Sequence, residues 1–132
     1  TNSPYAYIAM FDHFADTSIV ARAGGEVVGF AMGYVPPRSP RTLFVWQVAV
    51  APKFKGRGVA RQILGDLHAR VAASHGVEYV ACTITPSNEA SQGLFRSFAR
   101  HVGAEISRKS DYYPVSIFPL SVAHEGEDLV TV

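Results

Sequence analysis

This chain of 132 residues contains a single cysteine and has a formal net charge of only +1. The single cysteine, Cys82, excludes an internal disulfide and is typical of a reducing cytoplasm. Because Cys82 lies in an apolar, strand-like run, we expect a buried and inert thiol rather than a nucleophile. Lysine and arginine number 12 against 11 aspartates and glutamates, which gives no case for nucleic-acid binding.

Long apolar runs and metal-ligand motifs are missing as well. The longest apolar runs fall far short of the roughly 20 residues that span a membrane. The five histidines have no paired spacing, which argues against a metal site. We therefore expect one cytoplasmic domain, residues 1–132, with no metal, no membrane and no nucleic-acid partner.

Enough hydrophobic sequence remains, 48% of the chain, to build one core. Periodicity and turn residues predict helices over Tyr5–Phe14, Val59–Ala73 and Ser87–Arg100. Asn2-Ser3-Pro4 should start the first helix, Gly76 should stop the second, and Gly24-Gly25 should make a hairpin turn. The apolar face of the second helix is expected at Val59, Ile63, Leu67 and Val71. They predict strands over Thr17–Ala23, Glu26–Tyr34, Thr42–Val50, Val77–Ile84, Ala104–Ser107 and Asp128–Val132, the last of these at a sheet edge. The aromatic stretch Tyr112–Leu120 contains two prolines and is expected to be irregular. This order predicts a mixed α/β layer fold, with a parallel strand pair and right-handed crossover between Thr42 and Ile84.

The chain is organised around one basic, glycine-containing loop between a strand and a helix. Two glycines let the backbone approach a ligand closely, and the first amides of the following helix have no intrahelical partner. Such a junction suits a phosphate or pyrophosphate. The loop matches neither a P-loop nor a dinucleotide fingerprint. A basic surface turn after a core strand explains the loop about equally well. The candidate ligand residues are Lys55, Gly56, Arg57, Gly58, Val59 and Ala60.

A second segment, Thr83–Ser91, ends a strand, turns at Pro86 and opens a helix. It carries Asn88 and the pair Ala90-Ser91, and Leu94-Phe95 follow. Together with the glycine loop, these motifs resemble the GNAT superfamily of N-acetyltransferases. The resemblance implies acetyl-CoA as cosubstrate and a central mixed, mostly antiparallel, twisted sheet flanked by helices. It also implies a further strand and helix ahead of Thr1.

Several other motifs narrow this resemblance. They include Asn2-Ser3-Pro4-Tyr5, the run from Phe44 to Val50 around Trp46, Thr83-x-Thr85-Pro86, and His124-Glu125-x-Glu127 near the end of the chain. Together they resemble the diaminobutyrate acetyltransferases of the ectoine pathway. That family transfers acetyl from acetyl-CoA to the γ-amine of a small diamino acid, by direct attack in a ternary complex. Family analogy also implies a homodimer.

The resemblance assigns roles to individual residues. The strand before the glycine loop would be splayed by a bulge, and its Val48 backbone amide would stabilise the thioester oxygen. Val50 would bond the pantetheine. Asn88, Ser91 and Phe95 would also contact the coenzyme. Phe95 stands where many members carry a tyrosine that protonates the leaving thiolate. Glu127 is the candidate base. The diamino acid would be lined by Tyr5, Trp46, Thr83, Thr85, His124 and Glu127.

Each assignment has a plainer alternative. Trp46 could be core packing, Asn88 an ordinary helix cap, and His124 with Glu127 a solvated acidic tail. Two other functions also stay open at this point. One is acetylation of another small amine or a peptide N-terminus, and the other is a coenzyme-binding module without catalysis.

Overall fold

The computed structural model describes residues 2–132, which form two compact units, one up to Val80 and the other Ala81–Val132. The described residues contain six strands and three α-helices, the α/β class that was predicted. No helix in this part of the chain combines the length and apolar character needed to cross a membrane.

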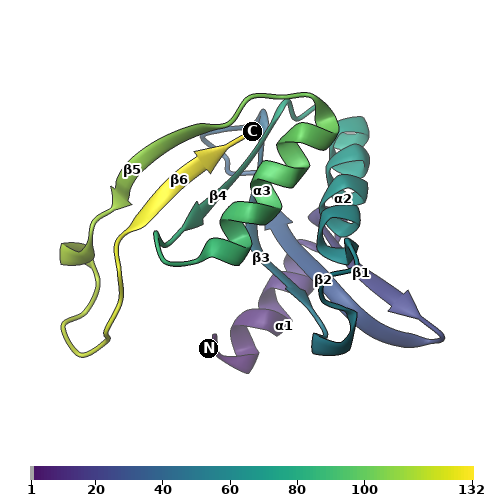
Figure 1. The fold of residues 1–132 in the computed structure, drawn as a ribbon, viewed down its shortest axis with the longest axis horizontal. Helices are drawn as coiled ribbons and strands as arrows, with labels where there is room; N and C mark the ends of the chain where they lie inside the picture. The colour runs from purple at the N-terminus through teal and green to yellow at the C-terminus, as the bar shows by residue number, and fades with distance from the viewer. Residues whose placement is uncertain (1) are drawn as a thin grey trace. The chain divides into compact units, whose positions relative to one another are not determined.

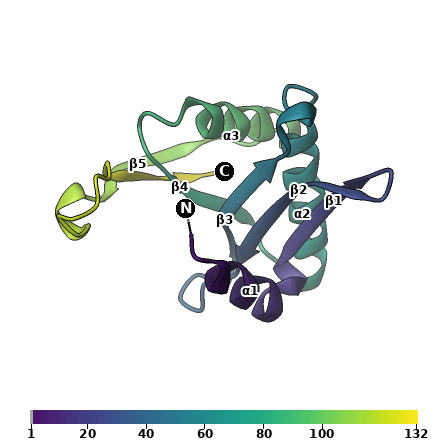
Figure 2. The ribbon, with the colours of Figure 1, turned by 90° about the horizontal axis from the view of Figure 1, so that it is seen from below.

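The first unit is an antiparallel meander with two helices (Figure 1). Ser3 caps the first helix by accepting a hydrogen bond from the Ala6 amide, and Pro4 occupies its first turn. Gly24 and Gly25, both with positive φ, make the tight turn of the hairpin that projects at the right in Figure 2. The predicted bounds agree within two residues. The elements are α1 (Pro4–His13), β1 (Ser18–Ala23), β2 (Glu26–Tyr34), β3 (Thr42–Val50) and α2 (Val59–His75).

The two helices cover opposite faces of this meander. A Cβ built on Gly29 of β2 would lie 2.9 Å from Ile63 Cδ1, so α2 packs closely on that face. The next residue, Phe30, points to the other face and contacts Tyr7 and Phe11 of α1, at 6.3 and 5.8 Å between ring centroids. The buried side of α2 consists of Ile63, Leu64, Leu67 and Val71. The predicted apolar face was right at three positions, but Val59 is only partly buried and Leu64 was not predicted. Gly76, in the left-handed conformation, ends α2 as predicted.

Strand β3 carries a bulge at Trp46. Met32 pairs with Gln47, whereas the next residue, Gly33, pairs with Val45, so Trp46 is the extra residue. A bulge of this kind bends the strand and re-aims neighbouring groups. This is the strand distortion that the family resemblance implied.

The second unit differs more from the prediction. It contains β4 (Tyr79–Ile84) from Ala81 onward, α3 (Glu89–Val102), β5 (Ser107–Tyr113) and β6 (Glu127–Thr131). Strand β6 pairs antiparallel with β4 on one side and with β5 on the other. The prediction of an edge strand at Asp128–Val132 was therefore wrong, because β5 supplies the edge instead.

The location of β5 was also mispredicted. Gly103 caps α3 in a left-handed conformation, and the strand begins only at Ser107 and runs to Tyr113. All seven of its residues are exposed, so it has no buried alternation that a periodicity search could detect. Tyr112 and Tyr113 belong to this strand, so only the later part of Tyr112–Leu120 lies outside β5, and it includes the short 3₁₀ turn Val115–Ile117. Strands β5 and β6 with their connection form the arm at the left of Figures 1 and 2.

Candidate functional site

The glycine loop has the backbone conformation that a close ligand requires. Gly56 and Gly58 have φ of 76° and 77°, in the left-handed region that side chains disfavour. A Cβ at Gly56 would have no neighbour within 4 Å, and one at Gly58 would meet only the Arg61 guanidinium at 3.9 Å. The glycines therefore serve the backbone turn, and the space beside them is open to a ligand.

The start of α2 presents amides outward. Its N-cap, Gly58, has no side chain to accept a hydrogen bond. The first helical bond runs from the Gln62 amide to the Gly58 carbonyl at 3.0 Å, so the Val59 and Ala60 amides have no acceptor within the helix. These amides lie at the positive end of the helix dipole, which favours an anion. A diphosphate therefore fits this junction.

Two basic side chains near the loop, those of Lys53 and Arg57, lie over the ring of Phe54. The Arg57 guanidinium lies 5.3 Å and the Lys53 ammonium 5.5 Å from the centre of the Phe54 ring. Lys53 also forms a 3.5 Å ion pair with Glu26, and both side chains are exposed. Lys55 and Arg57 are exposed as well, so their charge is available to an anion in the solvent.

The backbone of β3 sets the direction of two amides that were predicted to bind the coenzyme, those of Val48 and Val50. The Ala51 amide donates to the Val28 carbonyl of β2 at 2.7 Å. Amides alternate in direction along a strand, so those of Val48 and Val50 point away from β2. Neither amide is used in the β2–β3 ladder, as the roles predicted for Val48 and Val50 require.

Aromatic side chains surround Trp46 on the α1 side of the meander. The Trp46 and Tyr7 rings lie 5.8 Å apart, and Tyr7 also meets Phe30. Tyr5, which was predicted to line the substrate pocket, is 78% exposed, and Tyr7 is the α1 tyrosine against Trp46. Nearby, the Asn2 amide donates to the Gln47 side chain at 3.3 Å, just after the bulge. The sequence does not show which of the two tyrosines of α1 faces the sheet, so it could not identify Tyr7 as the neighbour of Trp46.

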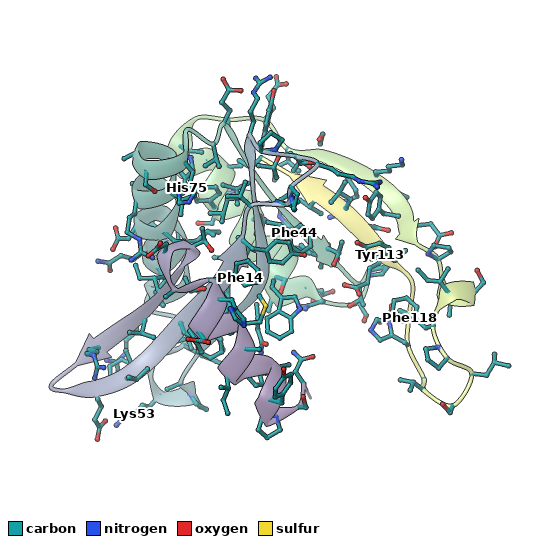
Figure 3. The ribbon with its side chains drawn as sticks, turned by 180° about the vertical axis from the view of Figure 1, so that it is seen from behind. Phe14, Phe44, Lys53, His75, Tyr113 and Phe118 are labelled. Atoms are coloured by element: carbon teal, nitrogen blue, oxygen red, sulfur yellow. The ribbon has the colours of Figure 1, made fainter. Side chains whose placement is uncertain are left out.

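Another aromatic group in the same unit packs Phe14 against Tyr34 and Tyr34 against Phe44. The ring centroids lie 5.5 and 5.4 Å apart, and Phe14 and Phe44 are labelled in Figure 3. This group anchors the end of α1 to β2 and β3.

In the second unit, the turn after β4 is held by backbone and side-chain bonds. The Asn88 side chain accepts from the Ser91 amide at 3.1 Å, which makes it the N-cap of α3. The Asn88 amide donates to the Thr85 carbonyl, and the Gln92 side chain donates to the Pro86 carbonyl at 2.7 Å. Phe95 is almost completely buried. The capping alternative for Asn88 is thus realised, and its Nδ2 group is the part left to serve a ligand.

The predicted acidic and histidine residues meet near the start of β6. His124 Nε2 lies 4.0 Å from Glu127 Oε2, and His124 stacks on Phe118 with ring centroids 4.0 Å apart (Figure 3 labels Phe118). His124 Nδ1 also contacts the Glu125 carbonyl. Glu127 pairs with Tyr113 across the β5–β6 ladder. The His124 side chain is 34% exposed and that of Glu127 is 21% exposed, so neither belongs to a fully solvated tail.

Contacts that the sequence did not indicate also hold this region. Glu125, passed over between His124 and Glu127, accepts a hydrogen bond from Ser87. Thr83 pairs with Leu129 of β6, whereas Thr85 follows the last residue of β4, so the shared strand face predicted for the two threonines does not extend to Thr85. Both threonines are partly exposed.

Cys82 is not part of a reactive centre. Burial, opposed by the Arg108 guanidinium and reinforced by the Glu127 carboxylate, raises the pKa of the Cys82 thiol to about 12. The thiol is therefore protonated at neutral pH, as expected for an inert cysteine. Within residues 2–132, no three His, Cys, Asp or Glu side chains come together as a set that could hold a metal ion.

Residues 1–99 match the model of the acetyltransferase (GNAT) family. The chain belongs to this family. The fold class predicted from the sequence is thereby confirmed, and the GNAT family uses acetyl-CoA as the acyl donor.

Curated relatives of this GNAT chain are named L-2,4-diaminobutyric acid acetyltransferases. Those from Shouchella clausii, Nocardia farcinica and Streptomyces coelicolor are 43%, 42% and 45% identical to it. The matches cover 97%, 100% and 99% of this chain, and 70%, 66% and 76% of those proteins. The chain thus spans about two thirds to three quarters of the length of these relatives. The predicted resemblance to this family is confirmed.

Solved structures agree. Diaminobutyrate acetyltransferase EctA from Paenibacillus lautus, in complex with its substrate L-2,4-diaminobutyric acid and coenzyme A, superposes with a TM-score of 0.89. It is 39% identical, and the match covers 98% of this chain and 77% of that one. Ard1 from Thermoplasma volcanium, with a TM-score of 0.74 and 15% identity, shares the fold alone.

Proposed function

We propose that this GNAT chain transfers the acetyl group of acetyl-CoA to the γ-amino group of L-2,4-diaminobutyrate, as a cytoplasmic step of ectoine synthesis that serves osmotic stress. The observation that carries this proposal is the 39% identity, over 98% of the chain, to an enzyme that binds this diamino acid and coenzyme A. The chain acts as one domain, residues 1–132, by direct attack in a ternary complex.

The coenzyme is held by backbone groups. The Lys55 amide donates to the Pro52 carbonyl at 3.3 Å, so the diphosphate is bound by the amides from Gly56 to Ala60. The charges of Lys55 and Arg57 support this binding. Val50 bonds the pantetheine arm, Ser91 and the Asn88 Nδ2 group donate to it, and Phe95 packs against it. When bound, acetyl-CoA supplies an activated acetyl thioester.

The Val48 amide stabilises negative charge on the thioester oxygen. This role needs a preorganised donor, and the Val48 amide, just beyond the Trp46 bulge, points away from β2 and takes no part in the β2–β3 ladder. A donor of this kind contributes roughly 3 to 4 kcal/mol to lowering a barrier in other acyl-transfer enzymes.

Glu127 accepts the proton of the substrate amine. An alkylammonium has a pKa of about 10.4 and no lone pair, so it must lose a proton before attack. Glu127 is a carboxylate with His124 beside it at 4.0 Å, and it carries the charge that an amine requires. Trp46, Tyr5, Thr83, Thr85 and His124 line the diamino acid.

Thiolate departure does not use a tyrosine. Phe95 has no proton to give, and its ring is buried. A thiolate whose conjugate acid has a pKa of about 8.5 leaves without obligatory protonation, and water can protonate it afterwards.

The chain functions as a homodimer. Its support is the apolar surface of the β5–β6 connection, where large side chains face the solvent together. Those at least half exposed are Val115, Ile117, Leu120 and Val122. Light scattering on the wild type and on a quadruple serine variant of these residues tests this proposal, since only the variant is expected to be monomeric.

A substrate panel tests the reaction. Thiol release from acetyl-CoA is measured with diaminobutyrate, ornithine and lysine at equal concentrations. We expect diaminobutyrate to give the highest kcat/KM, and equal rates with all three amines would refute the substrate assignment. Calorimetric coenzyme binding with background thiol release would favour a non-catalytic module, and a preference for another amine would favour the related acetyltransferase.

A variant test addresses the base. Glu127→Gln keeps the size of the side chain but cannot accept a proton, so kcat should fall by about 100-fold or more. Coenzyme affinity should not change, because the proposed diphosphate site lies in the loop. An unchanged kcat at neutral pH would remove Glu127 from this role.

A further inference from the structure

The β5–β6 pair contains a large irregularity opposite Asp128. Lys109 pairs with Leu129 and Tyr113 pairs with Glu127, so three residues of β5 lie opposite the single Asp128 of β6. In a regular ladder the unpaired backbone of such a bulge would be left without partners. Something other than the ladder must therefore hold it.

The Asp128 carboxylate supplies those bonds. Its Oδ1 accepts from the Asp111 backbone amide at 2.8 Å, and its Oδ2 accepts from the Arg108 guanidinium at 3.0 Å. Asp111 has a φ of 56°, and within residues 2–132 it is the single non-glycine residue with a left-handed backbone. Aspartate tolerates this conformation better than most residues, but it still costs free energy. The bond to Asp128 fixes the strained residue in place.

The Asp128 carboxylate is buried and charged, so the fold depends on its two hydrogen bonds. Asp128 is 8% exposed, in contrast to the exposed residues of β5 around it. The Asp111 amide, and then Arg108, hold the pKa of the Asp128 carboxyl below its ordinary value against the opposing effect of burial. A buried carboxylate with two donors is stabilising only while both bonds are present.

A glycine brings the end of the connection against the same bulge. A Cβ on Gly126 would lie 2.7 Å from Asp111 Oδ1 and 3.1 Å from the Tyr113 carbonyl oxygen. The Asp111 side chain could move, but the Tyr113 backbone could not move without shifting β5. Gly126 thus allows the chain to enter β6 close to β5, directly before Glu127.

We propose that Asp128 is a positioning residue that, with Gly126, ties the β5 bulge to β6 and so sets the position of Glu127 and His124. Alternate residues of a strand face opposite sides, so Asp128 presents its carboxylate on the face opposite to Glu127 and acts on it through the backbone. The inference rests on the proposed function, in which Glu127 and His124 contact the diamino acid.

The tie predicts an effect on the amino-acid substrate and not on the coenzyme. In Asp128→Asn, one oxygen becomes an NH₂ group, which cannot accept, so either the Asp111 amide or Arg108 loses its acceptor. Because Glu127 is both the proposed base and a substrate contact, a displacement of about 1 Å should raise the KM for diaminobutyrate and lower kcat, each roughly tenfold or more. The Kd for coenzyme A should stay within about twofold, since the glycine loop lies elsewhere in the chain. Asp66→Asn, an exposed aspartate of α2, is the matched control and should leave all three constants unchanged.

A structural readout separates this inference from the proposed function. The ring-proton NMR signals of His124 depend on its stacking against Phe118, at 4.0 Å in the wild type. Asp128→Asn should shift them, and Asp66→Asn should not. Unshifted His124 signals in Asp128→Asn overturn the positioning inference, whether or not the enzyme acetylates diaminobutyrate. A wild type that binds coenzyme but does not acetylate diaminobutyrate overturns the proposed function alone.

Two milder variants cover the case in which Asp128→Asn does not fold. Arg108→Met removes one of the two bonds from a partly exposed side chain, and Gly126→Ala disturbs the approach of Gly126 to Asp111 and Tyr113 without removing either bond to Asp128. Both should shift the His124 signals and raise the KM for diaminobutyrate less than Asp128→Asn does. A parallel loss of coenzyme affinity and substrate affinity in these variants would show a general structural role and overturn the inference.

Discussion

The two hairpin-like pairs of the chain are built on different principles. Strands β1 and β2 join through the two-residue turn Gly24-Gly25, so their pairing is determined by adjacent residues. Strands β5 and β6 are joined by residues 114–126, and their irregular register depends on a side-chain tie from Asp128. The first pair is encoded by local sequence and was predicted to within two residues. The second is encoded at long range, and its register could not be read from the sequence.

The glycine loop belongs with the locally encoded features, and changing it should have the largest effect. Gly58→Val forces a β-branched residue into a left-handed conformation with φ near 77°, so the loop must change shape. We expect the affinity for coenzyme A to fall by roughly ten- to a hundredfold, measured by calorimetry.

The control for Gly58→Val lies in the same helix. Gly65 has no neighbour within 4 Å of an added Cβ, and its φ is not positive. Gly65→Ala should leave coenzyme affinity unchanged and stabilise the fold by about 0.5 to 1 kcal/mol. If Gly58→Val bound coenzyme as tightly as Gly65→Ala, the loop would not be the diphosphate site.

The local turn should be the next most sensitive to change. Gly25 has a φ of 84° and open space around it, so an alanine there is strained by its backbone alone. Gly25→Ala should lower the free energy of unfolding by about 1 to 2 kcal/mol without altering the KM for diaminobutyrate. Urea unfolding and steady-state kinetics measure the two effects. A rise in KM equal to that of Asp128→Asn would erase the contrast between the two strand pairs.

The contribution of the Asp128 carboxylate to the free energy of unfolding should depend on pH in the acid range. The pKa of Asp128 is lowered in the fold, so its contribution to stability is fully present above the unfolded-state value of about 3.9. The contribution is lost as the pH falls from there through the folded-state pKa. The stability difference between wild type and Asp128→Asn should therefore be constant near neutral pH and shrink below about pH 4. A difference that persisted unchanged in acid would mean that the charge of Asp128 contributes nothing.

The smallest expected effect is at Cys82. With a pKa of about 12 and a buried position, the native thiol should not react with iodoacetamide at pH 8, whereas the urea-unfolded chain should. Mass spectrometry measures the modification. Rapid alkylation of the native chain would show that the second unit opens readily around β4.

Most of the first unit followed from short-range signals. Ser3-Pro4 marked the start of α1, Gly76 the end of α2, and the glycine pair the first hairpin. The bulge at Trp46 came only from the family resemblance, because one extra residue leaves no mark in an apolar run. Tyr7 was missed as the neighbour of Trp46 because two tyrosines lie on one short helix and the sequence does not show which faces the sheet.

The second unit was harder for physical reasons. Strand β5 is exposed along its whole length, so hydrophobic periodicity could not locate it. Asp128 read as an ordinary polar strand residue, since its two donors lie 17 and 20 positions earlier in the sequence. The resemblance indicated His124 and Glu127 only as residues that line the substrate, and the structure adds that their side chains lie 4.0 Å apart.

The buried thiol has a practical consequence for fluorescent labelling of this protein. A dye carrying a maleimide will find no target in the native chain unless one is supplied, since Cys82 is its one cysteine and is enclosed. Replacing the exposed Ser116, in the short turn after β5, with cysteine would therefore create a single addressable point on the arm. Fluorescence from that point could report on the arm while a ligand arrives, with no background from the rest of the protein.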